Sequence, residues 1–516
     1  MKDMILNFNP EEEMEVKDRL YKKLKEYVEK FNEDDEEIYK QDIDNAHALQ
    51  WMYENIPLFE CPDPIIEEIY YFRWWTFRKH IKTIPGGHVI TEFLPDVDWS
   101  GPYNSINCAN GFHIREGRWL RNSQKIIEDT IQFWLTGEGD AFSYSSWLCW
   151  AIWEYCQATG KYEFGISHLD ELIAYFEGWK NQFTKEGLYW SIDDRDAMEY
   201  SISGSGYRPT LNSYMYGNAV AIGNFAQLAG KKELSEKYYG IAEKIKFSVE
   251  KKLWNRDFFQ VIPADIDVEK KAFVHCKTMD FQEIPIEHNV KELIGYIPWY
   301  FDLPDAGYEK AFVYLCNPYH FLGKKGVYTA DKEHPRYRYE VAHECLWNGP
   351  SWPYATTQML VAVSNVLNNY VKEDGEYNIP LKTEEYFSLF KQYADSQYRM
   401  REDGKKIPWI DENLDGDTGE WISREILKKN GWKKEKGGYE RGKDYNHSMF
   451  CDLVITGLLG FIPGEDENLK LTPKIPESWD YFRLEKLPYH GELYCLQYDK
   501  SGKKYGEGKG IQIRKE

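Results

Sequence analysis

Several features are scarce or missing in this 516-residue sequence, and each absence excludes a class of protein. Lys and Arg number 64 against 85 Asp and Glu, and the formal charge of −21 would repel nucleic acid or an anionic membrane surface. No stretch approaches the roughly 18 apolar residues that a membrane span requires. The N-terminus lacks the apolar segment of a secretory signal. We therefore expect a cytoplasmic protein that binds neither nucleic acid nor membrane.

Cysteine is present without a disulfide or metal-binding pattern. The nine cysteines are an odd number, no C-x-x-C spacing occurs, and several lie in apolar stretches, as Cys149 and Cys451 do. They are predicted to be buried reduced thiols. The sequence also lacks an H-E-x-x-H motif, a Cys/His cluster, a phosphate-binding loop and a dinucleotide fingerprint. We therefore expect neither a metal nor a cofactor.

Aromatic residues, by contrast, are unusually abundant. The 19 Trp, 39 Tyr and 26 Phe make up 16% of the chain. Sugars stack their C–H faces on flat rings while their hydroxyls need polar neighbours, so the surplus is compatible with carbohydrate binding. A large helical core packed with rings would show the same composition. Composition alone does not separate the two interpretations.

Apolar residues recur at three- and four-residue spacing along most of the chain, which predicts helices. The predicted helices cover residues 43–56, 64–81, 110–134, 142–159, 167–183, 210–230, 233–252, 288–300, 305–317, 351–371, 382–401 and 445–460. Long connections separate them at 83–108, 184–208, 253–287, 319–349 and 403–444. Loops of this length are usually functional. The pattern predicts an all-α fold, an (α/α)6 barrel whose helix pairs close into a ring with the long loops at one end.

The two ends of the chain differ from this pattern. Residues 1–40 are predicted to form a charged helical extension before the barrel of residues 41–464. From residue 465 to 516, short alternating runs are split by Gly-rich turns. Such runs are typical of strands, so we expect a small β-rich appendage there.

The acidic loop at 187–218 is the strongest candidate for chemistry. It places four carboxylates within seven residues, among several rings. The carboxylates are Asp193, Asp194, Asp196 and Glu199, and the rings are Trp190, Tyr200 and Tyr207. A carboxyl group among rings has a raised pKa, which is what a general acid requires. The competing interpretation is an acidic surface turn.

Two further loops combine rings with polar groups. In residues 344–353, Trp347 and Trp352 bracket a Gly-Pro turn, and Asn348 lies between them. The rings are suited to a sugar subsite, although a hydrophobic staple at a helix start would use the same residues. In residues 408–421, Glu412 follows Trp409 closely and is the candidate base.

The last of these loops has a competing interpretation. The run Asp411-x-Asn413-x-Asp415-Gly416-Asp417 matches the first seven positions of a calcium-binding EF loop. Its twelfth position is Ile422 where such a loop requires Glu. Calcium would therefore be a structural ion at most.

The order of motifs over residues 140–460 resembles glycoside hydrolase family 63 and its relatives, the mannosylglycerate hydrolases and trehalases. The similar motifs are a helix ending at Ala158-Thr-Gly-Lys, Gly187-Leu-Tyr-Trp, Leu253-Trp-Asn, Tyr296-Ile-Pro-Trp, Gly326-Val-Tyr-Thr-Ala, Trp347-Asn-Gly-Pro-Ser-Trp-Pro and Glu412-Asn-Leu-Asp-Gly-Asp-Thr-Gly. The resemblance implies an (α/α)6 barrel and hydrolysis of a glycoside.

Carried onto this sequence, the resemblance implies Glu199 as the general acid and Glu412 as the general base. The family usually has Asp in the acid motif, so Asp196 stays an alternative acid. The family also tends to have Arg where this chain has Asn348, which leaves the substrate open. Substrate-binding candidates complete the site: Trp190, Arg195, Asn212, Tyr216, Trp347, Asn348, Trp352 and Trp409.

Together these observations predict a hydrolase that cleaves an α-linked glycoside or small oligosaccharide with inversion at the anomeric carbon. Two alternatives remain open at this point. One is a sugar-binding protein that kept the cleft without the chemistry. The other is a different (α/α)6 enzyme, such as a rhamnosidase, an unsaturated uronyl hydrolase or an epimerase. An epimerase would be expected to place His at the cleft, and most His residues lie outside these loops.

Overall fold

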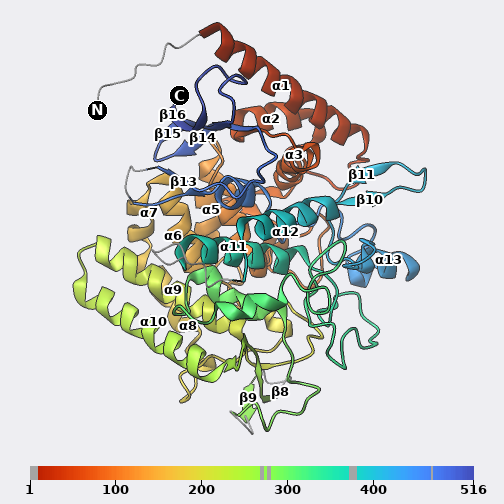
Figure 1. Cartoon of the computed structure of the whole chain (residues 1–516). Coiled ribbons are helices and arrows are strands. Elements are labelled where there is room, and N and C mark those ends of the chain that lie inside the picture. Colours follow the sequence, from red (N-terminus) through yellow and green to blue (C-terminus); the bar gives the residue numbers. More distant parts are fainter. Residues whose placement is uncertain (1–9, 268–271, 276–279, 371–379, 466–468) are drawn as a thin grey trace.

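Helices dominate the computed structural model, which describes residues 10–267, 272–275, 280–370, 380–465 and 469–516 (Figure 1). They form two concentric rings, the (α/α)6 barrel that the sequence predicts. The inner ring consists of α4 (Asn110–Gly117), α6 (Leu148–Thr159), α9 (Pro209–Leu228), η6 (Leu293–Phe301), α11 (Pro353–Asn369) and η9 (Leu453–Leu458). The outer ring consists of α3 (Pro64–Lys79), α5 (Gln124–Leu135), α8 (Leu169–Gly178), α10 (Lys232–Lys252), η7 (Glu309–Tyr314) and α12 (Thr383–Ser396).

The two rings differ in how much of each helix is buried. Inner helix α6 buries nearly every side chain, as a helix that is apolar on all sides must. Outer helix α10 buries one face only, along Tyr238, Ala242, Ile245 and Val249. This spacing of three and four residues is the amphipathic pattern that identified the helix in the sequence.

The inner ring is closed by buried polar contacts between its first and last members. Arg115 and Arg118 of α4 pair with the Asp452 carboxylate, with N–O distances of 2.9 and 2.7 Å. The Glu116 carboxylate accepts the backbone N–H groups of Phe450, Cys451 and Asp452 at 2.7–3.1 Å. These contacts join residues more than 330 positions apart and fix the register at which the ring closes.

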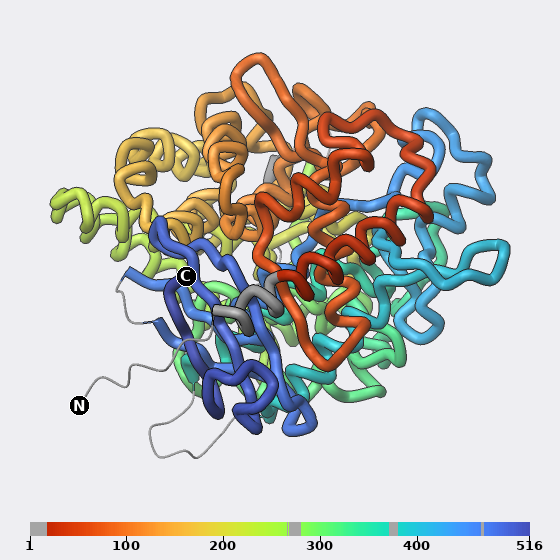
Figure 2. The backbone as a smooth tube through the Cα atoms, turned by 90° about the horizontal axis from the view of Figure 1, so that it is seen from above, coloured from red at the N-terminus to blue at the C-terminus, as the bar shows by residue number. Residues whose placement is uncertain are grey.

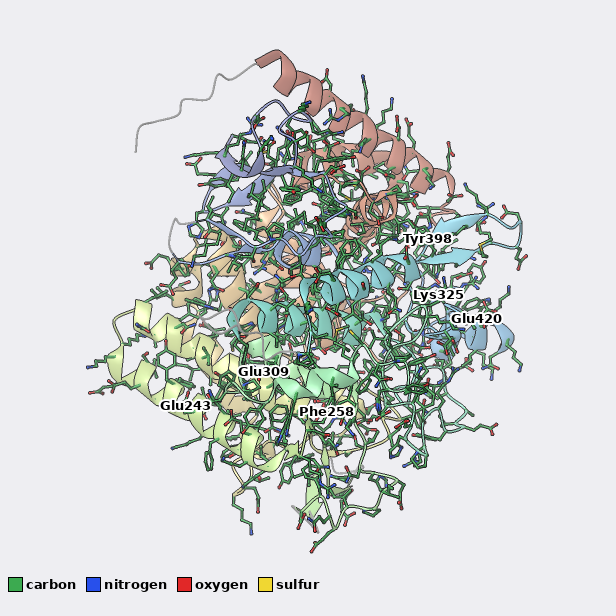
Figure 3. All side chains as sticks on the ribbon, viewed as in Figure 1. Glu243, Phe258, Glu309, Lys325, Tyr398 and Glu420 are labelled. Atoms are coloured by element: carbon green, nitrogen blue, oxygen red, sulfur yellow. The ribbon has the colours of Figure 1, made fainter. Side chains whose placement is uncertain are left out.

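The long loops gather at one end of the barrel, beside α13 (Ile422–Lys429) and the hairpin of β10 (Tyr398–Met400) and β11 (Lys406–Pro408) (Figure 1). Two of these loops touch directly. The N–H of Lys325 donates to the carbonyl of Gly416 at 2.6 Å, and the Lys325 side chain lies beside Gly419, the chain neighbour of Glu420 (Lys325 and Glu420 are labelled in Figure 3). Inner helices begin at this end, so the loops that precede them form one surface.

The C-terminal strands pack on the barrel near the N-terminal helices α1 (Pro10–Glu33) and α2 (Ala48–Asn55) (Figure 2). Strands β14 (Tyr481–Tyr489), β15 (Glu492–Asp499) and β16 (Gly510–Lys515) form an antiparallel sheet. Its fourth strand, β1 (Leu58–Glu60), comes from the N-terminal part of the chain and pairs with β14. The predicted β-rich character of this segment is confirmed, while the domain boundaries at residues 40 and 464 stay predictions.

Short two-stranded pairings and a few further helical turns occupy the connections. They are β2 (Ile81–Ile84) with β3 (Gly87–Ile90), β4 (Gly206–Tyr207) with β7 (Ile262–Pro263), β5 (Trp254–Asn255) with β6 (Phe258–Phe259), β8 (Asp265–Asp267) with β9 (Ala272–His275), and β12 (Phe461–Ile462) with β13 (Lys470–Leu471). Helix α7 (Tyr162–Ser167) follows α6.

Four predicted helices differ from the structure. The helix predicted over 305–317 is the shorter 3₁₀ segment η7, and the other three differ as follows. The single helix predicted over 110–134 is two helices, α4 and α5, because the chain turns back where Gly117 lies against Ile127. The predicted helix over 288–300 is the 3₁₀ segment η6, which contains Pro298, a residue without the N–H that an α-helix needs. The last predicted helix is largely the π-helical η9.

No helix among the described ranges is both long and apolar enough to cross a membrane. The cytoplasmic location remains a prediction.

Candidate active site

A cleft of about 350 Å³ opens among the long loops, at the end where the inner helices begin. Its wall is built from the connections before α4, α6, α9 and α11 and from the loops at 412 and 435–445. Glu199, Glu412 and Trp352, three of the predicted site residues, line this cleft together. Residues some 200 positions apart therefore share one pocket, as the acid–base hypothesis requires.

Glu199 lies on a strained turn at the cleft wall. Ala197 and Tyr200 on either side of it have positive φ angles of 56° and 63°. Such conformations cost free energy and are concentrated at functional sites. The Glu199 carbonyl accepts the N–H of Trp347 at 3.1 Å, which ties the turn to the second predicted loop.

The environment of Glu199 favours its protonated form. Burial, together with the negative charges of Asp194 and Glu412, raises the pKa of its carboxyl to about 8, against the lowering effect of its own backbone N–H. The carboxyl is therefore protonated at neutral pH and able to donate. This is the state that a general acid must hold before reaction.

Glu412 lies in the opposite kind of environment. Its Oε1 accepts a hydrogen bond from Nε of Arg441 at 2.7 Å and lies 2.6 Å from Nη2 of the same guanidinium. Its Oε2 accepts the Cys345 thiol at 3.2 Å and the Ser423 hydroxyl at 3.3 Å. Glu412 is 1% exposed, and its contacts with Arg441, Cys345 and Ser423 hold its carboxyl group in one orientation at the cleft. Such a group is suited to take a proton from water.

Glu92 is a third carboxyl in the cleft, which the sequence analysis missed. It accepts hydrogen bonds from the Tyr445 hydroxyl and from the Cys108 thiol, the latter at 3.2 Å. Burial raises the pKa of Glu92 to about 7, although these two hydrogen bonds act to lower it. Its only signal in the sequence is its place in the long connection 83–108, beside an apolar ring at Phe93.

Glu344 and Arg441 were also missed by sequence analysis and extend the network around the base. Arg441 Nη1 lies 3.2 Å from Glu344, and Lys436 Nζ lies 3.1 Å from the same carboxylate. Burial alone would raise the pKa of Glu344, but Arg441 and Lys436 outweigh it and hold the pKa below its ordinary value. Arg441 therefore bridges two carboxylates, and only Glu412 of the pair was predicted.

The aromatic wall of the cleft is formed by Trp352, and Trp347 stacks on the face of Trp352 that points away from the cleft. The two rings are stacked, with centroids 4.5 Å apart and planes 14° apart. Trp352 lines the cleft and its Nε1 donates to the Leu346 carbonyl at 2.7 Å. Trp347 supports this ring from the side away from the cleft.

Asp196, the alternative acid, lies outside the cleft lining and is fully engaged in structure. Its carboxylate pairs with Arg208 at 2.6 Å and accepts hydrogen bonds from Ser145, Ser191 and Thr210. These contacts hold the Asp196 side chain away from the cleft, where a substrate would bind. This favours Glu199 over Asp196 as the acid.

Other predicted substrate-binding residues also lie outside the cleft lining, and their polar groups bond to the backbone or pack in the core. Arg195 donates to the Phe142 carbonyl at 2.7 Å and stacks on Trp179. Asn212 accepts the Tyr189 N–H and donates to the Tyr189 carbonyl, both at 2.8 Å. Asn348 donates to the Tyr339 carbonyl at 2.8 Å.

The remaining predicted rings are placed similarly. Trp190 is buried in the core. Trp409 lies under the Arg399 guanidinium at 3.9 Å and donates to Asp411 at 3.3 Å. Tyr216 lies on α9, outside the residues that line the cleft.

The described residues offer little for a metal ion. Asp415 of the calcium-like run pairs with Arg338 and accepts the N–H groups of Asp417 and Thr418, which uses the oxygens that an ion would need. His343, Glu344 and Cys345 place one ligand atom each within 4.8 Å of one another, the group of this kind found among the described residues. The positive charges beside Glu344 and a raised thiol pKa at Cys345, which burial causes, make this group unfavourable for a cation.

Comparison with known proteins gives one strong family match. The profile described as "Mannosylglycerate hydrolase MGH1-like glycoside hydrolase domain" matches residues 102–448, which include Glu199, Glu412 and Arg441. A solved structure titled "Sialidase" is 38% identical, with a TM-score of 0.84 over 96% of this chain. That match covers 43% of the other protein, so this chain spans less than half of its length.

Two more distant structures share only a loose likeness. An α-L-rhamnosidase from Dictyoglumus thermophilum is 12% identical, with a TM-score of 0.49 over 87% of this chain and 43% of its own. A GH63 mannosylglycerate hydrolase from Thermus thermophilus is 10% identical, with a TM-score of 0.46 over 70% of this chain and 95% of its own. Scores this low carry no conclusion about function.

Proposed function

Because the chain belongs to the mannosylglycerate hydrolase MGH1-like family of glycoside hydrolases, we propose that it cleaves its glycoside with Glu199 as general acid and Glu412 as general base. One observation carries this assignment. Within a single cleft, burial drives the carboxyl of Glu199 toward its protonated form, whereas the carboxyl of Glu412 is ion-paired with Arg441. Two titratable groups with environments that differ in this way are the signature of an acid–base pair.

The proposed reaction is hydrolysis with inversion. Glu199 donates its proton to the glycosidic oxygen as the bond from that oxygen to the anomeric carbon breaks. Glu412 removes a proton from a water that attacks the same carbon from the opposite face. Inversion requires the two carboxyls to be about 6.5–9.5 Å apart, so that this water fits between them. Trp352 provides the flat surface on which the sugar ring stacks.

The charge of the cleft favours a neutral glycoside over an acidic one, and the α linkage is what the family resemblance implies. The name of the 38% identical relative would suggest an acidic sugar, but that relative is more than twice as long as the matched part. Six carboxyl groups line the cleft against two cationic side chains, and both cations pair with Glu344 or Glu412. The six are Glu92, Asp194, Glu199, Glu344, Glu412 and Glu435. A substrate carboxylate would enter this field against repulsion.

The decisive experiment follows the anomer released. Proton NMR during hydrolysis of neutral α-linked disaccharides, glycosyl-glycerates and a sialoside would identify substrate and stereochemistry together. We expect a neutral sugar to be released as the β-anomer first. First appearance of the α-anomer would refute inversion. Preference for the sialoside or for a glycosyl-glycerate, each of which carries a carboxylate, would refute the neutral substrate class.

Two variants test the residue roles. Glu199→Gln and Glu412→Gln should each lower kcat by about 10²–10⁴-fold, the usual contribution of acid–base catalysis. Glu420→Gln is a matched control, because Glu420 is exposed on the same loop as Glu412 (Figure 3). Turnover by Glu412→Gln equal to that of the control would exclude Glu412 as the base.

A further inference from the structure

A second cavity, of about 230 Å³, lies at the end of the barrel opposite the cleft. Its wall comes from the C-terminal parts of the inner helices: Arg118 follows α4, Trp153 lies late in α6, Tyr300 late in η6 and Asn365 late in α11. Since these helices begin at the cleft, the cavity lies toward the opposite end of the barrel. The linings of the two sites share none of the described residues.

The lining of this second cavity, called the lower cavity below, combines aromatic rings with amide and hydroxyl groups. Trp150, Trp153 and Tyr300 supply the rings, and Ser364 and Asn365 are among the polar side chains. Ligand sites typically show this mixture, in which apolar faces supply contact area and a few placed polar groups fix orientation. A cavity kept only for packing would be filled by side chains.

Some polar atoms at the cavity have no partner within the described protein. Asp302 Oδ1 is buried without a hydrogen bond, while Oδ2 of the same carboxylate accepts Asn369 Nδ2 at 2.8 Å. Asn365 is fixed by its Nδ2, which donates to the carbonyls of Trp299 and Tyr300 at 3.0 and 2.9 Å, and this leaves its Oδ1 free to accept. Buried polar atoms are nearly always satisfied by protein, water or ligand, so the cavity contents must supply a bond to Asp302 Oδ1.

Charge and size define the chemical class of the occupant. Arg115 pairs with Glu154 and Asp452, and Arg118 pairs with Asp452, so both cations at the wall are neutralised. An anionic ligand would find no unpaired cation there. The volume is below the ~300–1,000 Å³ of drug-sized ligand sites but holds several waters of about 30 Å³ each. The occupant is therefore small, neutral and rich in hydroxyl groups.

We propose that this lower cavity is a second binding site, for a small neutral polyol such as a monosaccharide. Asp302 and Asn365 accept hydrogen bonds from hydroxyl groups of the ligand, and the Ser364 hydroxyl forms a further hydrogen bond with it. Trp153 and Tyr300 contact the apolar face of the ligand. The site is independent of the acid–base assignment at the cleft, and it requires no catalysis.

The test uses crystals of the full chain soaked in D-glucose, together with calorimetric titration of the same sugar. We expect sugar density in the lower cavity. Ser364→Leu, which fills the cavity from α11, should remove that density and weaken the corresponding binding at least about tenfold, or 1.4 kcal/mol. Ser364→Ala is the matched control, since it removes the hydroxyl but leaves the space open, and it should retain density.

A second variant guards against misfolding of Ser364→Leu, because overpacking a core side chain is itself destabilising. Asp302→Ala adds no volume and should also lose the density. Turnover at the cleft should stay within about twofold in all three variants, so failure here is distinguishable from failure of the proposed reaction. Only water in the lower cavity of soaked crystals, or glucose binding unchanged by both Ser364→Leu and Asp302→Ala, would overturn the proposal.

Discussion

The alkaline limb of the pH–rate profile tests the role of Glu199 most directly. A general acid works only while protonated, and burial raises the pKa of Glu199 to about 8. If Glu199 is the acid, kcat/KM should be sustained through neutral pH and fall as the pH rises through about 8. A carboxyl at its ordinary pKa of about 4.3 would have lost its proton far below neutrality.

Asp194 provides a perturbation of known sign. It is exposed at the rim of the cleft, and its negative charge contributes to the raised pKa of Glu199. Two unit charges 4 Å apart in water interact by about 1 kcal/mol, and one pKa unit corresponds to about 1.36 kcal/mol. Asp194→Asn should therefore move the alkaline limb down by at most about 0.7 pH, and added salt should shrink the difference.

The assay is initial-rate kinetics of parent and variant over pH 5–10 at low and at high ionic strength. Asp170→Asn is the control, since Asp170 is an exposed acid on α8 outside the cleft. It should leave the limb unchanged. A limb near pH 5 in the parent would refute the account of Glu199. A limb that Asp194→Asn moves upward would refute the electrostatic reasoning.

Three further predictions concern the Arg441 contact to the base, the ion pairs that close the inner ring of helices, and the effect of Glu199 on stability. Arg441→Lys should lower kcat about tenfold or more with a smaller change in KM, because Lys cannot reproduce the paired Nε and Nη2 contacts to Glu412; an unchanged kcat would contradict this. Asp452→Asn should lower the free energy of unfolding in urea by about 3–5 kcal/mol, since it leaves Arg118 without its carboxylate partner and Arg115 with Glu154 alone, whereas the exposed control Glu29→Gln should cost under about 1 kcal/mol. Glu199→Gln should raise the melting temperature at pH 8, and this gain should disappear toward pH 4.5. The reason is that the raised pKa of Glu199 in the folded state lowers the stability of the parent only above the pKa of the unfolded chain. Equal melting temperatures of parent and variant at pH 8 would contradict this.

Local sequence patterns predicted the barrel well because each helix carries its own periodic signal. They predicted the site less completely, for a physical reason. Glu199 and Glu412 stand out because each lies among rings on a long loop. Glu92 and Arg441 lie in loops without such a pattern, and they join the site only because ring closure brings their loops to the same end.

The misplaced candidates follow from the same limit. Asn212 has the right chemistry for a sugar hydroxyl, but its amide bonds both backbone groups of Tyr189. Trp409 was chosen for its closeness to Glu412 in sequence, yet its face carries Arg399. The type of a residue in a loop determines which groups its side chain is able to bind. Which group it does bind depends on tertiary contacts that are not local in the sequence.

The direction of the inner helices bears on how so many carboxyls coexist in one cleft. Each helix dipole places partial positive charge at its N-terminus, worth about 0.3–1 kcal/mol to a nearby anion. The inner helices begin at the cleft, so their positive ends converge there, while the outer helices run the opposite way farther from the axis. Because the dipole effect falls off within a turn, the inner ring dominates at the cleft floor. The barrel thus offsets part of the repulsion among the carboxylates, and the raised pKa of Glu199 means that for this group burial outweighs that stabilisation.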